Sequence, residues 1–182
     1  MFPKGRLRED PAFICAGGLD CIFQKNRYLC SVSFSPYPPM DDLIRLLRSS
    51  GCSLVLRDAQ GHTTTHSQRG VRDLLALLDA PSKRLHGADV ADKVVGRAAA
   101  ALMVEGGVRR VWAEVLSRQA LPFFEQAGIS YDAASIVEGI VRRTDDQSCP
   151  LEEITAPART PAEAETLLRR HIEAMRKIKQ TQ

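Results

Sequence analysis

A strand-like run, a helix-like run and another strand-like run follow one another in this chain, and this order limits the fold most. Residues 108–116, VRRVWAEVL, are mostly apolar, as expected for a strand covered on both faces. Ser117 can cap a helix over RQALPFFEQA, which ends at Gly128, and residues 129–143 contain one or two further strands. A helix between two strands of one sheet makes a right-handed crossover, so the strands are parallel. The pattern predicts an α/β protein.

The preceding residues add an antiparallel part to the predicted sheet. Residues 41–50 read as an amphipathic helix, and residues 52–67 as a hairpin. A short helix follows over residues 70–80, and residues 88–105 read as a longer helix with Asp89 as N-cap. Together these elements predict a three-layer α/β sandwich, in which helices cover both faces of a mixed β-sheet.

Composition divides the chain into three parts. Residues 1–39 mix Pro, Gly, Cys and aromatic residues without a sustained period and end in the rigid spacer SPYPPM. We interpret them as a poorly ordered N-terminal extension; the alternative is a short hairpin added to the domain. Residues 40–156 form the α/β domain. Residues 157–182, with six Lys/Arg against three Asp/Glu, form a basic C-terminal helix.

Cysteine and charge content restrict the location and the partners. Five cysteines, with no CxxC pair and no secretory signal, indicate reduced thiols in the cytoplasm. No apolar run is long enough to span a bilayer. The net charge of +3 is only mildly basic, which argues against nucleic acid as the main partner. The C-terminal helix has an apolar stripe that can dock on the domain or pair with a second copy in a homo-oligomer.

Two segments, DKVVGRAAAALMVEGGVRRVWAEVLSRQALPFFEQAGISY and IVRRTDDQSCPLEE, resemble the domain-of-unknown-function family 1893, over about Met40 to Thr155. The resemblance implies a cytidine-deaminase-like fold without a settled activity. Zinc deaminases hold their metal with His and Cys residues at two helix starts, beside a glutamate that moves protons. The corresponding residues, 92–94 and 117–120, contain neither Cys nor His. We therefore expect no metal, no cofactor and no ordinary zinc-dependent deamination.

Lys93 and Asp92 are the first candidate site residues. On the predicted helix Lys93 lies in the first turn, where the helix dipole disfavours a cation by roughly 0.3–1 kcal/mol. Asp92 or a bound anion would offset this, and a lowered pKa would let Lys93 act as a base or nucleophile. The alternative is an exposed lysine whose stem covers apolar surface. Lys93, Asp92 and Ser117 would line the former catalytic cleft and bind a small anionic, nucleotide-like ligand at two helix N-termini.

Cys149 is the second candidate. Pro150 suits the first position of a helix, which makes Cys149 the N-cap and places Glu152 at the third position. Unpaired N–H groups at a helix start stabilise a thiolate, so Cys149 can be nucleophilic. The alternative is a structural cap in which Glu152 reaches back to the N–H group of Cys149. Glu152 also counts among the candidate ligand-binding residues.

Two histidines share one face of the predicted hairpin. His62 and His66 are four residues apart, about 13 Å along a strand, so we expect a solvated polar face rather than a metal site. Three functions remain open from the sequence. They are a deaminase-like domain that binds a small nucleotide-like ligand, a metal-independent enzyme with Cys149 as nucleophile, and a regulatory interaction module that acts through the basic C-terminal helix.

Overall fold

The computed structural model describes residues 38–68, 70–142 and 147–180. Every described helix and strand lies within Tyr37–Gln182. The extension predicted over residues 1–39 therefore lies almost entirely outside the described residues, as do Cys15, Cys21 and Cys30.

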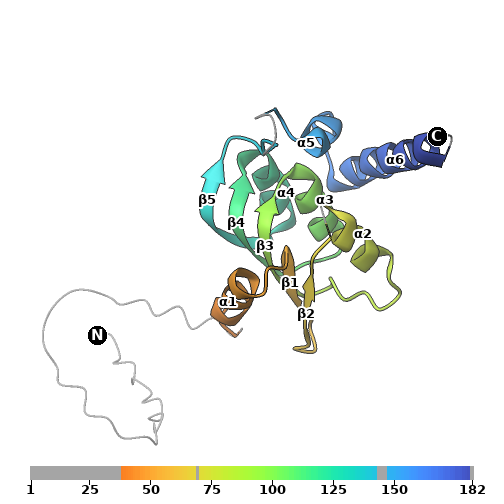
Figure 1. The fold of residues 1–182 in the computed structure, drawn as a ribbon. Helices are drawn as coiled ribbons and strands as arrows, with labels where there is room; N and C mark the ends of the chain where they lie inside the picture. Colours follow the sequence, from red (N-terminus) through yellow and green to blue (C-terminus); the bar gives the residue numbers. More distant parts are fainter. Residues whose placement is uncertain (1–37, 69, 143–146, 181–182) are drawn as a thin grey trace, which may run out of the picture. The chain divides into compact units, whose positions relative to one another are not determined.

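Five strands form one mixed sheet: β1 (Leu54–Arg57), β2 (Thr63–His66), β3 (Asp89–Val95), β4 (Arg110–Ser117) and β5 (Ser130–Val137). Their spatial order is β2-β1-β3-β4-β5 (Figure 1). β1 pairs antiparallel with both β2 and β3, whereas β3, β4 and β5 run parallel. The hairpin and the parallel crossover predicted from the sequence are both present.

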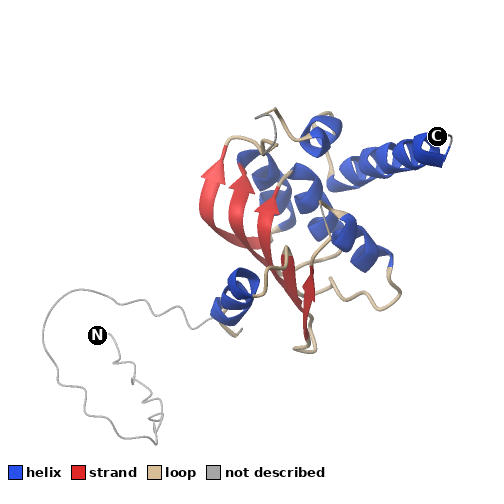
Figure 2. Cartoon of the chain, in the orientation of Figure 1, coloured by secondary structure: helices blue, strands red, loops and turns tan. Residues whose placement is uncertain are grey.

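Helices cover both faces of this sheet unequally. They are α1 (Asp41–Ser49), α2 (Arg72–Asp79), α3 (Arg97–Glu105), the 3-10 helix η1 (Arg118–Ala120), α4 (Leu121–Ala127), α5 (Pro150–Thr155) and α6 (Pro161–Gln180). α1 lies on one face, and α2 to α6 crowd the other (Figure 2). The small core under α1 contains Leu43, Leu47 and Trp112, and the large core under the other helices contains Leu102, Phe123 and Phe124. This architecture confirms the α/β class and the mixed sheet.

The segment 88–105 differs from its prediction, because it forms a strand and then a helix. β3 lies between β1 and β4 and is paired with both, so its backbone groups are satisfied as a strand. Val90, Val94 and Val95 are β-branched and favour this conformation. Gly96 is extended, and α3 begins only at Arg97. Asp89 is therefore the first residue of a strand and caps no helix.

Several local signals are confirmed. The hydroxyl of Ser117 accepts a hydrogen bond from the Gln119 N–H at 3.2 Å and caps η1. Gly128 ends α4 in the left-handed conformation, with φ 67°. Cys149 is the N-cap of α5, with Pro150 as first helical residue. No helix among the described residues combines the length and apolar character needed to cross a membrane.

Candidate functional site

Open α/β sheets bind ligands at the carboxyl ends of their parallel strands, so this edge of the sheet is the first candidate site. β3 ends at Val95 and β4 at Ser117, and α3 and η1 begin directly after them. Val95 pairs with Leu116, so the starts of the two helices lie at the same level of neighbouring strands. Two helix starts meet here, as the sequence predicted, although the residues at the start of α3 are Gly96 and Arg97.

A carboxylate of the chain itself occupies this edge of the sheet. Glu152, 2% exposed, accepts hydrogen bonds from the Arg97 N–H at 3.3 Å and from the Ile140 N–H at 2.6 Å. A Cβ on Gly96 would lie 3.1 Å from Glu152 Oε1, and one on Gly139 would lie 3.2 Å from Glu152 Oε2. The two glycines let the carboxylate approach the backbone closely. We call these N–H groups and the two glycines the carboxylate cradle.

Arg97 ties α5 to this edge. Its guanidinium donates hydrogen bonds to the carbonyl oxygens of Thr155 and Gln119 at 3.1 Å each, and to that of Ala158. It also lies 4.4 Å from the centre of the Phe123 ring, a favourable cation–π distance. α5, which contains Glu152, is thus held over the starts of α3 and η1 by several contacts.

Cys149 lies close to the cradle through its backbone. Its N–H donates to the Ile140 carbonyl at 2.8 Å, and its side chain makes no capping hydrogen bond. The alternative of a capping box formed by Glu152 is wrong, because the Glu152 carboxylate binds the N–H groups of Arg97 and Ile140 instead. The sequence pattern placed both residues on the correct helix, but the partner of Glu152 comes from another part of the chain.

Asp92 and Lys93 lie away from this edge. Both are in β3, and Asp92 is four residues before Gly96, about 13 Å along the strand. Lys93 is half-buried, and its N–H donates to the Ser53 carbonyl at 3.0 Å. No hydrogen bond or ion pair within the described ranges joins Lys93 to Cys149. The placement of Lys93 in the first turn of a helix is wrong, so the dipole argument for its reactivity no longer applies.

Asp92 is buried in the sheet with an acidic neighbour. Burial raises the pKa of Asp92 to about 7; the hydrogen bond from the Val94 N–H at 3.0 Å and the nearby backbone of Lys93 oppose this, and the charge of Asp73 adds to it. Only 8% of Asp92 is exposed, and no lysine or arginine of the described chain forms an ion pair with it. The Asp92 carboxyl group therefore titrates near neutral pH, and no described lysine or arginine forms an ion pair that would stabilise its charged form.

His66 lies near Asp92 and Asp73, and the sequence did not reveal that these three side chains are neighbours. The sheet register places His66 and Asp92 on either side of Leu54. His66 Nδ1 is 4.0 Å from Asp73 Oδ1, and His66 Nε2 is 3.1 Å from the Thr64 hydroxyl. Burial lowers the pKa of His66, and the Asp73 charge opposes this. The expected solvated polar face is confirmed for His62, whose side chain is 76% exposed, and is wrong for His66, whose side chain is 20% exposed. No three His, Cys, Asp or Glu residues of the described chain lie close enough to hold a metal ion.

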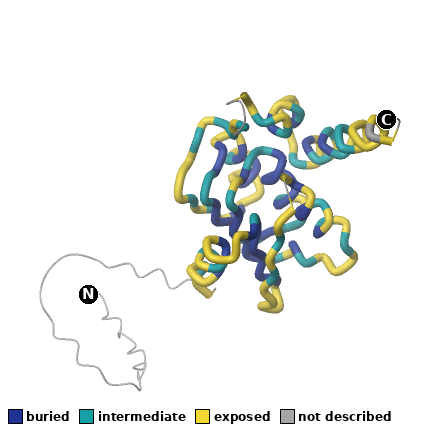
Figure 3. The backbone as a smooth tube through the Cα atoms, viewed as in Figure 1, coloured by how far each residue is buried: buried dark blue, intermediate teal, exposed yellow. Residues whose placement is uncertain are grey.

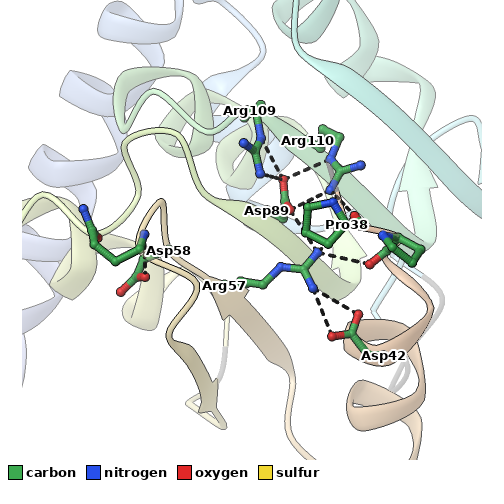
Figure 4. A network of polar contacts seen from close by, with 9 residues as sticks. Pro38, Asp42, Arg57, Asp58, Asp89, Arg109 and Arg110 are labelled. Atoms are coloured by element: carbon green, nitrogen blue, oxygen red, sulfur yellow. Dashed lines mark hydrogen bonds and ion pairs between the residues drawn. The ribbon is translucent and has the colours of Figure 1, made fainter. Parts of the chain in front are cut away.

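A different polar cluster marks the amino end of β3 (Figure 4). The fully buried carboxylate of Asp89 accepts hydrogen bonds from Arg57, Arg109 and Arg110, with shortest distances of 3.1, 2.8 and 2.6 Å. Burial alone would raise the pKa of Asp89, but the hydrogen bonds from these arginines outweigh it and lower the pKa. Arg57 also binds Asp42 of α1 at 3.0 Å. The cluster connects β1, β3, β4 and α1, which suits a structural role.

A groove between α2 and α6 is the second candidate site. It encloses about 640 Å³. Apolar side chains form much of its wall, with two arginines and one histidine beside them. The lining residues are Gln68, Gly70, Val71, Arg72, Leu75, Ala76, Asp79, Leu151, His171, Ile172, Met175 and Arg176. The sequence indicated the apolar stripe of the last helix, but the opposite wall, formed by α2, could not be assigned from it.

Comparison with known proteins identifies a family and a similar solved structure. Residues 42–172 match the model of a family described as a domain of unknown function (DUF1893). The crystal structure of a DUF1893 family protein (TM1506) from Thermotoga maritima has a similar fold. The TM-score is 0.64 at 21% identity, over 71% of this chain and 86% of that one. No curated protein matches the chain.

Proposed function

This chain belongs to the DUF1893 family, and we propose that it is a binding domain that recognises another protein through the groove between α2 and α6. One observation carries the proposal. The groove is open and lined by apolar and cationic side chains, whereas the edge of the sheet where a small ligand would bind is filled by Glu152. The basic C-terminal helix indicated by the sequence forms one wall of this groove.

We also propose that the fold is cytidine-deaminase-like and that this chain lacks the zinc chemistry of the deaminases. The element order, a helix and a hairpin followed by alternating helices and parallel strands, supports this relation. At the two helix starts the chain has Gly96-Arg97 and Ser117-Arg118-Gln119, which offer neither imidazole nor thiolate to a metal. Cys52 and Cys149 are free thiols, which supports a cytoplasmic location within the proposal.

The protein-binding proposal can be tested with one charged residue in the groove wall. Met175→Glu introduces a carboxylate into an apolar wall, so we expect a partner captured from an extract of the source cells to be lost. Ile136→Glu is the matched control, because Ile136 on β5 is 47% exposed and Met175 is 44% exposed. Capture should be quantified by mass spectrometry with wild-type and both variant proteins. Equal capture by Met175→Glu and wild type would contradict the proposal.

A second function is favoured by the carboxylate cradle. The N–H groups of Arg97 and Ile140 already bind one carboxylate, so a small anionic, nucleotide-like ligand could take its place if α5 moved. Glu152→Ala would vacate the cradle, and cytidine monophosphate or inorganic phosphate should then raise the melting temperature by several degrees. Glu153→Ala, at the exposed neighbouring position, is the control. If neither anion stabilises the Glu152 variant more than the control, this function is excluded.

An enzyme that uses Cys149 with Lys93 or Asp92 has less support. Cys149 is at the start of α5, whereas the buried Asp92 and the half-buried Lys93 lie in the middle of β3. A group that assists a nucleophile must be within hydrogen-bond reach of it or of the substrate. We therefore keep the two binding functions as the proposals to test.

A further inference from the structure

We infer that the groove between α2 and α6 receives an acidic amphipathic helix of a partner protein, an inference that rests on the proposed protein-binding function. Helix-in-groove recognition needs an elongated apolar depression, and its specificity comes from charges along the rim. Apolar side chains and charged side chains both line this groove.

The apolar stripe of α6 continues beyond the body of the domain. Ala164 and Leu168 of this stripe are fully buried in the large core, and Ile172 packs at its margin. Met175 and Ile178, one and two turns further along, are 44% and 56% exposed. Figure 3 shows how burial gives way to exposure along this helix. The stripe therefore offers apolar surface that no described part of the chain covers.

α2 provides the opposite wall. Val71 and Leu75 point from its beginning and first full turn, and Leu151 of α5 joins them. The groove encloses about 640 Å³, within the range of about 300–1,000 Å³ that is usual for binding pockets. Burial of apolar side chains there would contribute roughly 25 cal/mol per Å² of covered surface.

The charges around the groove favour an acidic occupant. Between Arg169 and Ile178 the sequence has four cationic residues and one acidic residue, Glu173; two of the cations, Arg169 and Lys177, are already in ion pairs with acidic side chains. Arg72 lies in the first turn of α2, where the helix dipole disfavours a cation. Its guanidinium group forms no hydrogen bond or ion pair with any described residue. Asp79, the one acidic residue of the lining, is bound by Arg169 at 2.6 Å. Carboxylates of a partner would meet Arg72 on one wall and Arg176 on the other.

Two other occupants fit these observations less well. A second copy would bring one cationic α6 against another, and like charges at an interface cost free energy. Nucleic acid would satisfy the arginines, but its phosphates would leave Leu75, Ile172 and Met175 without apolar contacts. An acidic amphipathic helix satisfies both the apolar walls and the charged rim.

The test uses the full chain and two designed 18-residue peptides. Both have leucines at helical positions i, i+3, i+4 and i+7; one has glutamates and the other lysines at the remaining positions. Fluorescence anisotropy should show at least tenfold tighter binding of the acidic peptide, and the preference should weaken as salt increases. Arg72→Glu and Met175→Glu should each weaken binding of the acidic peptide about tenfold or more, whereas Ile136→Glu should leave it unchanged.

The possible outcomes separate this inference from the proposed function. Equal binding of the two peptides, or binding that Arg72→Glu does not affect, overturns the inference that the groove receives an acidic helix. If Met175→Glu still loses a captured partner, the protein-binding function stands. Sedimentation of the chain as a dimer that Met175→Glu dissociates would assign the groove to a second copy. Binding of a single-stranded oligonucleotide that Arg72→Glu abolishes would assign it to nucleic acid, and either result overturns the inference.

Discussion

Two aspartates in β3 are three residues apart and have opposite electrostatic environments. Asp89, at the amino end of the strand, is surrounded by Arg57, Arg109 and Arg110, which hold its pKa below the usual value. Asp92 has no arginine or lysine ion-pair partner among the described residues; burial raises its pKa to about 7, with the charge of Asp73 adding to the effect. The same side chain in the same strand is therefore a fixed anion at one position and a group that titrates near neutral pH at the other.

The difference shows that burial alone does not decide the charge of a carboxyl group. Removal of either aspartate from water disfavours the charged form, and only matched donors reverse this. At Asp89 the donors come from the neighbouring strands β1 and β4, and the result joins three strands. At Asp92 the donors among the described residues are backbone N–H groups, and they do not offset the effect of burial on its pKa.

The largest expected effect is on the arginine cluster. Asp89→Asn removes the charge that neutralises three partly or fully buried guanidinium groups, so we expect unfolding to require about 3–5 kcal/mol less free energy at pH 7. Urea denaturation measures this difference. Asp42→Asn is the control, because the Asp42 side chain is 61% exposed and its ion pair joins Arg57 alone, so its loss should cost less than about 1 kcal/mol. Similar losses for the two variants would mean that Asp89 does not hold the cluster together.

The next effect is a pH dependence of stability caused by Asp92. Because the folded pKa of about 7 is above the unfolded value, the native state favours the protonated form. The stability from this group is complete below pH ~3.9 and falls by about 1.4 kcal/mol per pH unit until pH 7 is reached. Asp92→Asn should remove this fall, so its stability relative to the wild type should increase with pH.

Urea denaturation of both proteins at pH 5, 6, 7 and 8 measures the effect of Asp92. Asp89 does not interfere in this range: its folded pKa is lowered, so its contribution is present above its unfolded pKa and is lost only as pH falls through the folded pKa. The difference in the free energy of unfolding between variant and wild type at each pH cancels the contributions of the other titrating groups, including His66. A constant difference between them from pH 5 to pH 8 would show that Asp92 is ionised throughout.

The smallest expected effect is on the pKa of Asp92 itself. Asp73→Asn removes a negative charge that raises this pKa, so the pKa of Asp92 should fall, with a change in stability below about 1 kcal/mol at pH 7. Carbon-detected NMR titration of the Asp92 carboxyl group measures the shift. Asp79→Asn on the same helix is the control, since Asp79 is bound to Arg169 at the surface. Equal shifts in the two variants would indicate a general charge effect rather than a specific neighbour.

Much of the fold was predictable because its signals are local. Residues 108–137 showed a strand, a capped helix and another strand, and the caps at Ser117 and Gly128 are where the sequence indicated. The boundary between β3 and α3 was missed. The alanine run at 98–101 favours a helix, whereas the strand before it is stabilised by pairing with two distant segments. The valines at 90, 94 and 95, followed by Gly96, were the signal that could have placed this boundary.

The candidate sites were less predictable, since their parts meet only in the folded chain. Glu152 was expected to cap its own helix, but its partners Arg97 and Ile140 are 55 and 12 residues away. The stripe of α6 was visible in the sequence, whereas its position beside α2 depends on how both helices pack on α3 and the sheet.

The sequence by itself determined which segments become helices and strands in most of the chain, because propensity, periodicity and capping act over a few neighbouring residues. It also determined the family and the positive charge of the last helix. The tertiary structure alone decided the charge states of Asp89 and Asp92 and the shape of the groove. The guanidinium groups that reach Asp89 come from residues 20 to 32 positions away. Electrostatic and packing energies depend on distance in space, and distance along the chain does not reveal it.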